Sequence, residues 1–161
     1  MTIGFILNGE DVIVHTSAEC RLSDILRNTF SLLGTKAGCY TGNCGSCSIL
    51  LNGEVVKSCL VPAFKIRDSE IITIEGLIQT DEYQDIIAAF NEAGVENCGF
   101  CNTGKILATE ALLSRNLRPS NKEILTAFHG IRCRCTDPEE MVRVVTAIAK
   151  YRQRRVYGRS S

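Results

Sequence analysis

Apolar and polar residues alternate through much of the first half of the chain, a period typical of strands with one buried face. Strands are expected at residues 3–7, 12–14, 48–51, 54–57 and 71–74. The Asn-Gly pairs at residues 8–9 and 52–53 each separate two of these runs, and such pairs favour tight hairpin turns. Residues 22–30 carry apolar side chains at helical spacing instead. The first half therefore predicts a small mixed sheet with one helix.

Apolar residues recur every three to four positions in the second half, which predicts amphipathic helices. Four helices are expected, beginning near Asp81, Cys101, Ser120 and Asp137. Ser120 and Glu123 have the spacing of a capping box, and the proline after Asp137 suits the first turn of a helix. The pattern changes near residues 75–80, so the chain is divided into an N-terminal domain at residues 1–76 and a helical domain at residues 77–161.

The last eleven residues form a basic tail with four arginines and no acidic residue. The favoured interpretation is the end of a helix, where positive charge complements the helix dipole and the chain then frays. The alternative is a tail that docks on a partner subunit.

Charge and hydropathy exclude two classes of partner. Eighteen basic and eighteen acidic side chains cancel, so no positive field would attract a nucleic acid. No apolar run approaches the roughly 20 residues that a membrane-spanning helix needs, and the first residues lack the charged leader of a secretory signal. The expected protein is cytoplasmic and globular, with no nucleic acid or membrane partner.

Nine cysteines are the unusual feature of the composition. In a reducing cytoplasm such a density indicates metal or redox chemistry more often than disulfides. Cys20 stands alone and is interpreted as a small buried apolar residue, with a reactive thiol as the alternative. The other eight form two groups of four, separated by a cysteine-free stretch at residues 60–97.

The first cysteine group consists of Cys39, Cys44, Cys47 and Cys59. Its C-x4-C-x2-C…C spacing is that of plant-type [2Fe–2S] ferredoxins. Three thiolates from one segment must wrap a compact anionic cluster, and glycines in the loop allow the backbone to turn sharply and direct N–H groups at the cluster. A structural zinc site is the alternative, but it usually needs two C-x2-C pairs and only one is present.

The second cysteine group consists of Cys98, Cys101, Cys133 and Cys135. Each pair is expected at a helix end, where unpaired N–H groups and a partial positive charge favour thiolates. A redox-active C-x2-C motif at Cys98 and Cys101 is the alternative, although the βαβ context of such motifs is missing.

Together the two groups resemble one family, the small iron–sulfur subunits of molybdenum hydroxylases such as xanthine dehydrogenases, aldehyde oxidoreductases and carbon monoxide dehydrogenases. The resemblance extends from Ile3 to about Tyr151 and is carried by the segments at residues 34–39, 44–47, 98–101 and 133–136. It implies an α+β protein: an N-terminal β-grasp ferredoxin-like domain followed by a C-terminal four-helix bundle, each holding one [2Fe–2S] cluster. It also implies a large partner subunit with molybdopterin and, in most cases, a medium subunit with FAD.

The chain departs from the usual family pattern beside the second cysteine group. Asn97 stands in place of a glutamine that contacts the pterin, so Asn97 is a candidate for that contact. The other departures are Asn102, Thr103, Lys105, Asp137 and Pro138. The cysteines themselves are all present. Lys36 and Arg134, which are neighbours of the cysteines in sequence, could raise a cluster's potential, but solvated or ion-paired side chains are the favoured interpretation.

The resemblance predicts an electron-transfer subunit that performs no substrate chemistry itself, and no catalytic constellation is visible in the sequence. Purine (xanthine) hydroxylation is the first candidate for the whole enzyme because that branch is common; aldehyde, carbon monoxide or N-heterocycle oxidation follow. Two other functions stay open: a free-standing two-cluster carrier, and a zinc-stapled interaction module without a redox role.

Overall fold

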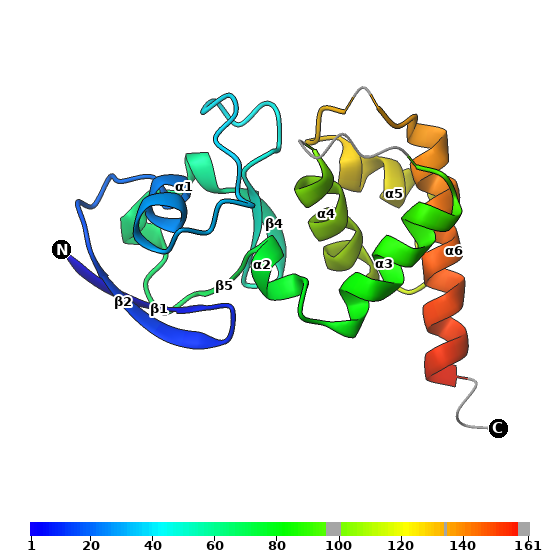
Figure 1. The fold of residues 1–161 in the computed structure, drawn as a ribbon, viewed down its shortest axis with the longest axis horizontal. Helices are drawn as coiled ribbons and strands as arrows, with labels where there is room; N and C mark the ends of the chain where they lie inside the picture. Colours follow the sequence, from blue (N-terminus) through cyan, green and yellow to red (C-terminus); the bar gives the residue numbers. More distant parts are fainter. Residues whose placement is uncertain (96–100, 134, 158–161) are drawn as a thin grey trace.

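A mixed five-stranded sheet forms the N-terminal part of the chain in the computed structural model, which describes residues 1–95, 101–133 and 135–157 (Figure 1). The strand order is β2-β1-β5-β3-β4; β1 and β5 are parallel and the other neighbours are antiparallel. The strands are β1 (Thr2–Leu7), β2 (Glu10–His15), β3 (Ser48–Leu51), β4 (Glu54–Lys57) and β5 (Glu70–Ile72). Both predicted hairpins are confirmed, because β1 pairs with β2 and β3 pairs with β4.

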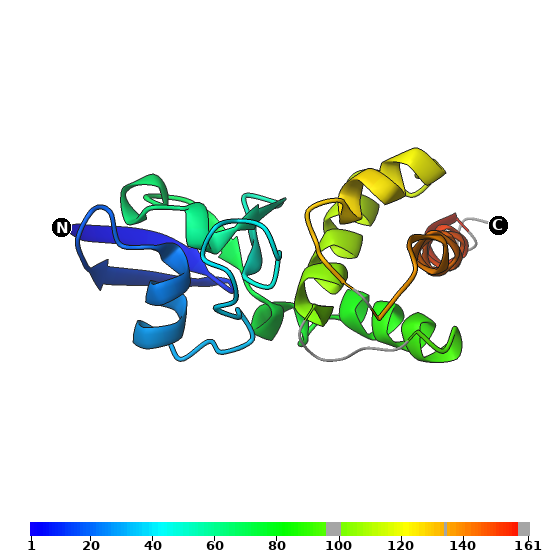
Figure 2. The same cartoon turned by 90° about the horizontal axis from the view of Figure 1, so that it is seen from above.

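Helices dominate the C-terminal part, and the expected α+β class is confirmed. In the described residues the N-terminal part contains the short helix α1 (Leu22–Asp24). The later α-helices are α2 (Ile74–Leu77), α3 (Asp81–Glu92), α4 (Asn102–Arg115), α5 (Asn121–Phe128) and α6 (Pro138–Tyr157). Figure 2 shows the sheet and its loops at one end and α3 to α6 at the other. Helix α4 packs against β3 and β4, so it joins the two ends.

Three of the four predicted helix starts can be traced to capping. Thr80 accepts the backbone N–H of Tyr83 at the start of α3. Ser120 and Glu123 form the predicted capping box at the start of α5. Helix α6 begins at Pro138, as expected. No helix in the described part of the chain is both long and apolar enough to cross a membrane.

The predicted strand at residues 71–74 is too long. Strand β5 ends at Ile72, and the short helix α2 starts at Ile74. The cause lies between them: the side chain of Asn8 accepts the backbone N–H of Thr73 at 2.8 Å and donates to its hydroxyl at 3.0 Å. This side chain takes the place of a strand partner, so the sheet cannot continue past Thr73.

The helix expected at residues 22–30 is also different in detail. Its first turn, α1, continues as a π-helical turn at Ile25–Thr29. Leu22, Ile25 and Leu26 are nevertheless buried in the core beneath the sheet, as the apolar spacing predicted.

The basic tail is helical for most of its length, because α6 continues to Tyr157. Arg152 is buried and donates to Glu110 at 2.7 Å, with Asp85 at 3.7 Å, while Arg155 lies 3.0 Å from Asp85. Burial raises the pKa of Glu110, although Arg152 acts in the opposite direction. Two of the four tail arginines therefore tie α6 to α3 and α4 within the chain.

Candidate metal centres

The β3–β4 hairpin brings the last two cysteines of the first group together. Cys47 immediately precedes β3, and Cys59 lies in the turn that follows β4. Because Ser48 pairs with Lys57, the two ends of the hairpin meet, and Ser58 donates both its N–H and its hydroxyl to the carbonyl oxygen of Cys47. Cys47 and Cys59 are 3% and 5% exposed.

The loop before β3 wraps around the sulfur of Cys39. The backbone N–H groups of Thr41, Asn43 and Cys44 point at this sulfur from 3.4, 3.3 and 3.4 Å. Together with the hydroxyl of Thr41, these donors lower the pKa of Cys39 to about 5. Successive N–H groups that converge in this way form a nest for an anion.

Burial acts in the opposite direction at the other end of the group. It raises the pKa of Cys59 to about 11, and the adjacent Cys47 adds to the increase. Thiols buried next to each other become thiolates when a metal ion supplies positive charge. The first group thus combines one stabilised anion with two buried thiols. Its fourth member, Cys44, has its sulfur 3.0 Å from the hydroxyl of Ser46.

Two members of the second cysteine group meet at the start of α4. Cys101 is buried at the N-cap position of this helix, and its sulfhydryl lies 3.0 Å from the sulfur of Cys133, in the connection between α5 and α6. The exposed Cys135 donates its backbone N–H to the sulfur of Cys133 at 3.4 Å. Cys98 and Asn97 lie outside the described residues.

A buried lysine, Lys105, lies beside this pair of cysteines. Its ammonium group donates to the hydroxyl of Thr136 at 2.7 Å, and its side chain lines the same cavity as Cys133. Burial by itself would raise the pKa of Cys133, but hydrogen bonds from Cys101 and Lys105 outweigh it and lower the pKa to about 6. Lys105, Cys133 and Thr136 line one wall of a cavity of about 230 Å³ that extends to α5 and α6.

The two cysteine groups are connected through the backbone. The N–H of Arg132 donates to the carbonyl oxygen of Cys44 at 3.1 Å, and Cys133 is the next residue. The contact is tight because Gly45 has a φ of +76° and leaves no space for a side chain: a Cβ there would lie 2.6 Å from the carbonyl oxygen of Gly130. The loop of the first group therefore rests directly on the segment that carries Cys133.

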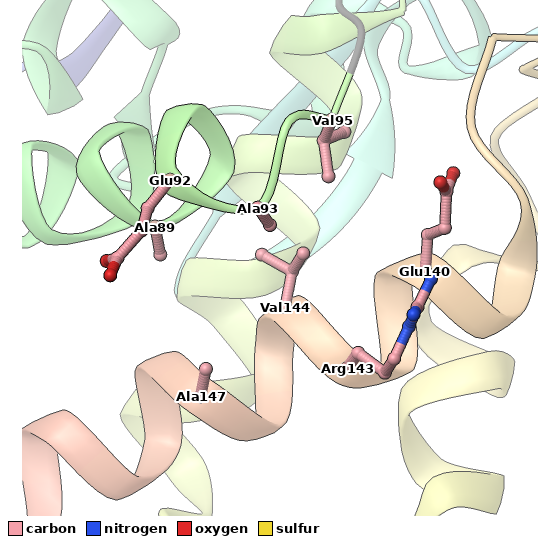
Figure 3. Close-up of a pocket in the computed structure, with 8 residues that line it drawn as sticks. All are labelled: Ala89, Glu92, Ala93, Val95, Glu140, Arg143, Val144 and Ala147. Atoms are coloured by element: carbon pink, nitrogen blue, oxygen red, sulfur yellow. The ribbon is translucent and has the colours of Figure 1, made fainter.

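Another hollow, of about 350 Å³, lies between α3 and α6 (Figure 3). Ala89 of α3 and Ala93, just after that helix, face Val144 and Ala147 of α6 across it. Glu140 and Arg143 lie along the α6 side. Its described lining contains neither cysteine nor histidine, so the candidate metal chemistry lies elsewhere.

Comparison with known families assigns both halves of the chain. Residues 14–94 match the family described as a 2Fe-2S iron-sulfur cluster binding domain, and residues 73–146 match a second family described as a [2Fe-2S] binding domain. The chain is 40% identical to the nicotinate dehydrogenase small FeS subunit of Eubacterium barkeri, over 84% of this chain and 87% of the relative. It is 35% identical to the xanthine dehydrogenase iron-sulfur-binding subunit of Escherichia coli O157:H7, over 90% and 92% of the two chains.

The chain belongs to the small iron–sulfur subunits of the molybdenum hydroxylases. Quinoline 2-oxidoreductase from Pseudomonas putida has a chain of the same fold, with a TM-score of 0.85 and 34% identity over 96% of both chains. The resemblance inferred from the cysteine spacing is confirmed. This iron–sulfur subunit is the electron-transfer part of a multi-subunit oxidoreductase, and its two matched domains correspond to two [2Fe–2S] clusters.

The described residues fit such clusters. The donors are thiols, and the N–H nest around Cys39 and the short Cys101–Cys133 contact both favour bound anionic sulfur. No three His, Cys, Asp or Glu side chains in the described part of the chain surround a single point as ligands of one ion.

The sequence motifs identified the cysteines but not the role of their neighbours. Lys105 was interpreted only as a departure from the family pattern, although a lysine beside Ile106 and Leu107 in an apolar stretch was a signal for a buried charge. Nothing in the sequence pointed to the backbone of Arg132. Cys20 is half-buried and packs against the core of the N-terminal sheet.

Proposed function

We propose that Cys39, Cys44, Cys47 and Cys59 hold one [2Fe–2S] cluster and that Cys98, Cys101, Cys133 and Cys135 hold the other. For the first set, the support is the hairpin that pairs Cys47 with Cys59 and the N–H groups that converge on Cys39. For the second set, the support is the 3.0 Å contact between Cys101 and Cys133, which are 32 residues apart in sequence. Cys98 is included because its spacing to Cys101 matches the family.

The same proposal divides the chain into a β-grasp ferredoxin-like domain at residues 1–76 and a four-helix [2Fe–2S] domain at residues 77–161. The mixed sheet with parallel β1 and β5 supports the first part, and helices α3 to α6 support the second. The hydrophobic core does not divide at the same boundary, because Leu50 of β3 packs in the same cluster as Phe90 of α3.

The chain relays electrons within a larger complex, and bound [2Fe–2S] clusters supply this chemistry by each taking up and releasing one electron. We propose a large partner subunit with molybdopterin, where substrate is oxidised, and a medium subunit with FAD as the acceptor. The observation that carries a relay through this chain is the hydrogen bond between Arg132 and Cys44, because it joins the two proposed ligand sets by a short bonded path. A cytoplasmic location suits a chain with this many cysteines, because a reducing compartment keeps thiols reduced.

For the substrate we propose an aromatic N-heterocycle, with purines such as xanthine as the first candidate. The names of the relatives favour this class: they include nicotinate, xanthine, isoquinoline and quinoline oxidoreductases. An aldehyde is the second candidate, because an aldehyde oxidoreductase from Megalodesulfovibrio gigas is 37% identical over 86% of this chain.

Asn97 is proposed to contact the pterin of the partner subunit. It precedes Cys98, and it offers the same amide as the family's glutamine on a shorter side chain. An amide that loses its partner in a buried interface costs roughly 1–3 kcal/mol, so a polar contact is favoured over none. Replacing Asn97 by alanine should slow reduction of the second cluster by substrate in rapid-mixing experiments, or loosen the pterin, while the first cluster stays spectroscopically intact.

The decisive test is co-purification of the tagged chain from its native source, followed by analysis for molybdenum and flavin. The expected result is a heteromer that contains molybdopterin and FAD and reduces its iron–sulfur clusters on addition of xanthine. Reduction by an aldehyde but not by xanthine or other N-heterocycles would reverse the order of the two substrate candidates. Isolation of the chain alone, with both clusters, would favour a free-standing carrier.

A further inference from the structure

Lys105 is the most deeply buried charged side chain in the described part of the protein. It is 1% exposed and lies on α4, one turn after Cys101. The whole side chain, including the ammonium group, is therefore shielded from solvent. A buried ammonium is costly unless an anion lies close to it.

The other buried cation in the described residues, Arg152, has such anions. It lies within 4 Å of the carboxylates of Glu110 and Asp85. Lys105 takes part in none of the ion pairs formed between described residues. It donates to the neutral hydroxyl of Thr136 and lies beside Cys133 in the lining of one cavity. Among the described residues, the sulfur of Cys133 is therefore the group that can supply the balancing negative charge.

We propose that Lys105 sets the reduction potential of the second cluster, by placing a buried positive charge against the ligand sulfur of Cys133. The inference rests on the proposed ligand set. A [2Fe–2S] cluster with four thiolate ligands is negatively charged and becomes more negative by one unit when it is reduced. A fixed positive charge stabilises the reduced form more than the oxidised form, so it raises the potential.

A purely structural role is the alternative, since Lys105 also ties α4 to Thr136, which lies just before α6. The two roles make different demands on the side chain. A structural tie needs a hydrogen-bond donor of the right length, whereas a potential-setting residue needs the charge. Lys105→Gln keeps a donor and removes the charge, and Lys105→Arg keeps both. Lys150→Met removes one charge from an exposed position of α6 and serves as the matched control.

The experiment is a redox titration of the full chain with both clusters loaded, followed by electron paramagnetic resonance. The signal of the second cluster is identified beforehand as the one that Cys101→Ser perturbs. Lys105→Gln should reduce the ratio of reduced to oxidised second cluster at a fixed potential at least tenfold, which corresponds to about 59 mV for one electron. Lys105→Arg and Lys150→Met should leave that ratio within about twofold of the original protein, and the first cluster should respond less in every variant.

An unchanged potential in Lys105→Gln, with full signal intensity, would overturn the inference. If the glutamine variant does not retain the second cluster, Lys105→Met is the second neutral variant. Loss of that cluster in both neutral variants but not in Lys105→Arg supports the need for charge. Loss in all three variants assigns Lys105 a structural role and rejects the proposal. An error in the proposed ligand set can be distinguished from an error in the role of Lys105, because Cys101→Ser would then leave both signals unaltered.

Discussion

The backbone N–H of Arg132 donates a hydrogen bond to the carbonyl oxygen of Cys44 across 3.1 Å. One residue belongs to the first cysteine group and the other immediately precedes Cys133 of the second, so this bond joins the two groups. The close approach depends on Gly45, because a Cβ atom added there would clash with the backbone of Gly130 and Ile131. The junction between the two halves of the subunit is therefore also the junction between its two proposed clusters.

Gly45→Ala should damage this junction. The added Cβ would lie 2.6 Å from the oxygen of Gly130 and 3.1 Å from the Cα of Ile131, and backbone atoms cannot move aside as a flexible side chain can. We expect a lower unfolding temperature, less bound iron and slower electron exchange between the clusters. Thermal unfolding, iron analysis and rapid-mixing reduction measure the three effects.

Gly53→Ala is the matched control for Gly45→Ala. Gly53 has a φ of +85°, close to the +76° of Gly45, but its Cβ would meet no atom within 4 Å. Both variants bear the cost of a left-handed alanine, about 1–2 kcal/mol, and only Gly45→Ala adds the clash. Equal effects of the two substitutions would show that the close approach at Gly45 is unimportant.

Local patterns in the sequence predicted the elements of the fold. The Asn-Gly turns, the capping box at Ser120 and the proline at the start of α6 are all local signals, and all three are confirmed. The strand after Ser69 was predicted to end two residues too late, because its end depends on Asn8, which binds Thr73 from 65 positions away in the sequence. A single sequence carries no signal for such a contact.

The same limit applies to the candidate site. Spacing predicted the two groups of cysteines, because the loop that carries three members of the first group is local in sequence. Charge next to the cysteines in the sequence pointed to Lys36 and Arg134, and Arg134 lies outside the described residues. Lys105 is a buried cation that this criterion did not identify, because it approaches Cys133 through the packing of α4 against the α5–α6 connection. Proximity in sequence is a poor guide to electrostatics when the partners come from different elements.

Arg152→Met should destabilise the helical part of the subunit. Removing one partner of a buried ion pair leaves uncompensated charge and costs on the order of 3–5 kcal/mol, here at Glu110 and Asp85. For a chain of this size that corresponds to a fall in the unfolding temperature on the order of 10 °C. Arg154→Met, at an exposed position on the same helix, should change it by less than about 2 °C and is the control.

The loss of stability in Arg152→Met should depend on pH, because burial raises the pKa of Glu110, one of the carboxyl groups that the substitution leaves without its partner. A carboxyl group with a raised pKa in the folded state favours folding when protonated; this contribution is fully present below its ordinary pKa of 4.5 and is lost as pH rises through the raised value. The difference in the free energy of unfolding between Arg152→Met and the original protein should therefore become smaller as the pH is lowered from about 8 to about 5. A gap that widens on acidification would contradict the assignment.

Purified subunit should contain about four irons and about four acid-labile sulfides per chain, since each of the two cysteine groups would hold one [2Fe–2S] cluster. Colorimetric iron and sulfide assays, with zinc measured in the same sample, check this. Dithionite should bleach the visible absorption. Stoichiometric zinc without labile sulfide would mean that the cysteines hold a structural metal and that the chain carries no electrons.

Two separate paramagnetic signals should appear on reduction, because the two sites differ in hydrogen bonding and exposure. The sulfur of Cys39 accepts three backbone N–H groups, whereas that of Cys133 lies against Cys101 and the charged Lys105. Hydrogen bonds and charge around cluster sulfurs change both the signal and the potential.

Cys44→Ser should therefore alter one signal and Cys101→Ser the other, because oxygen replaces sulfur at a single iron in each case. Cys20→Ser is the control and should alter neither, since Cys20 fits the spacing of neither group and packs against the core of the sheet. If Cys44→Ser and Cys101→Ser changed the same signal, the division of the eight cysteines into two ligand sets would be wrong, even with the full content of iron.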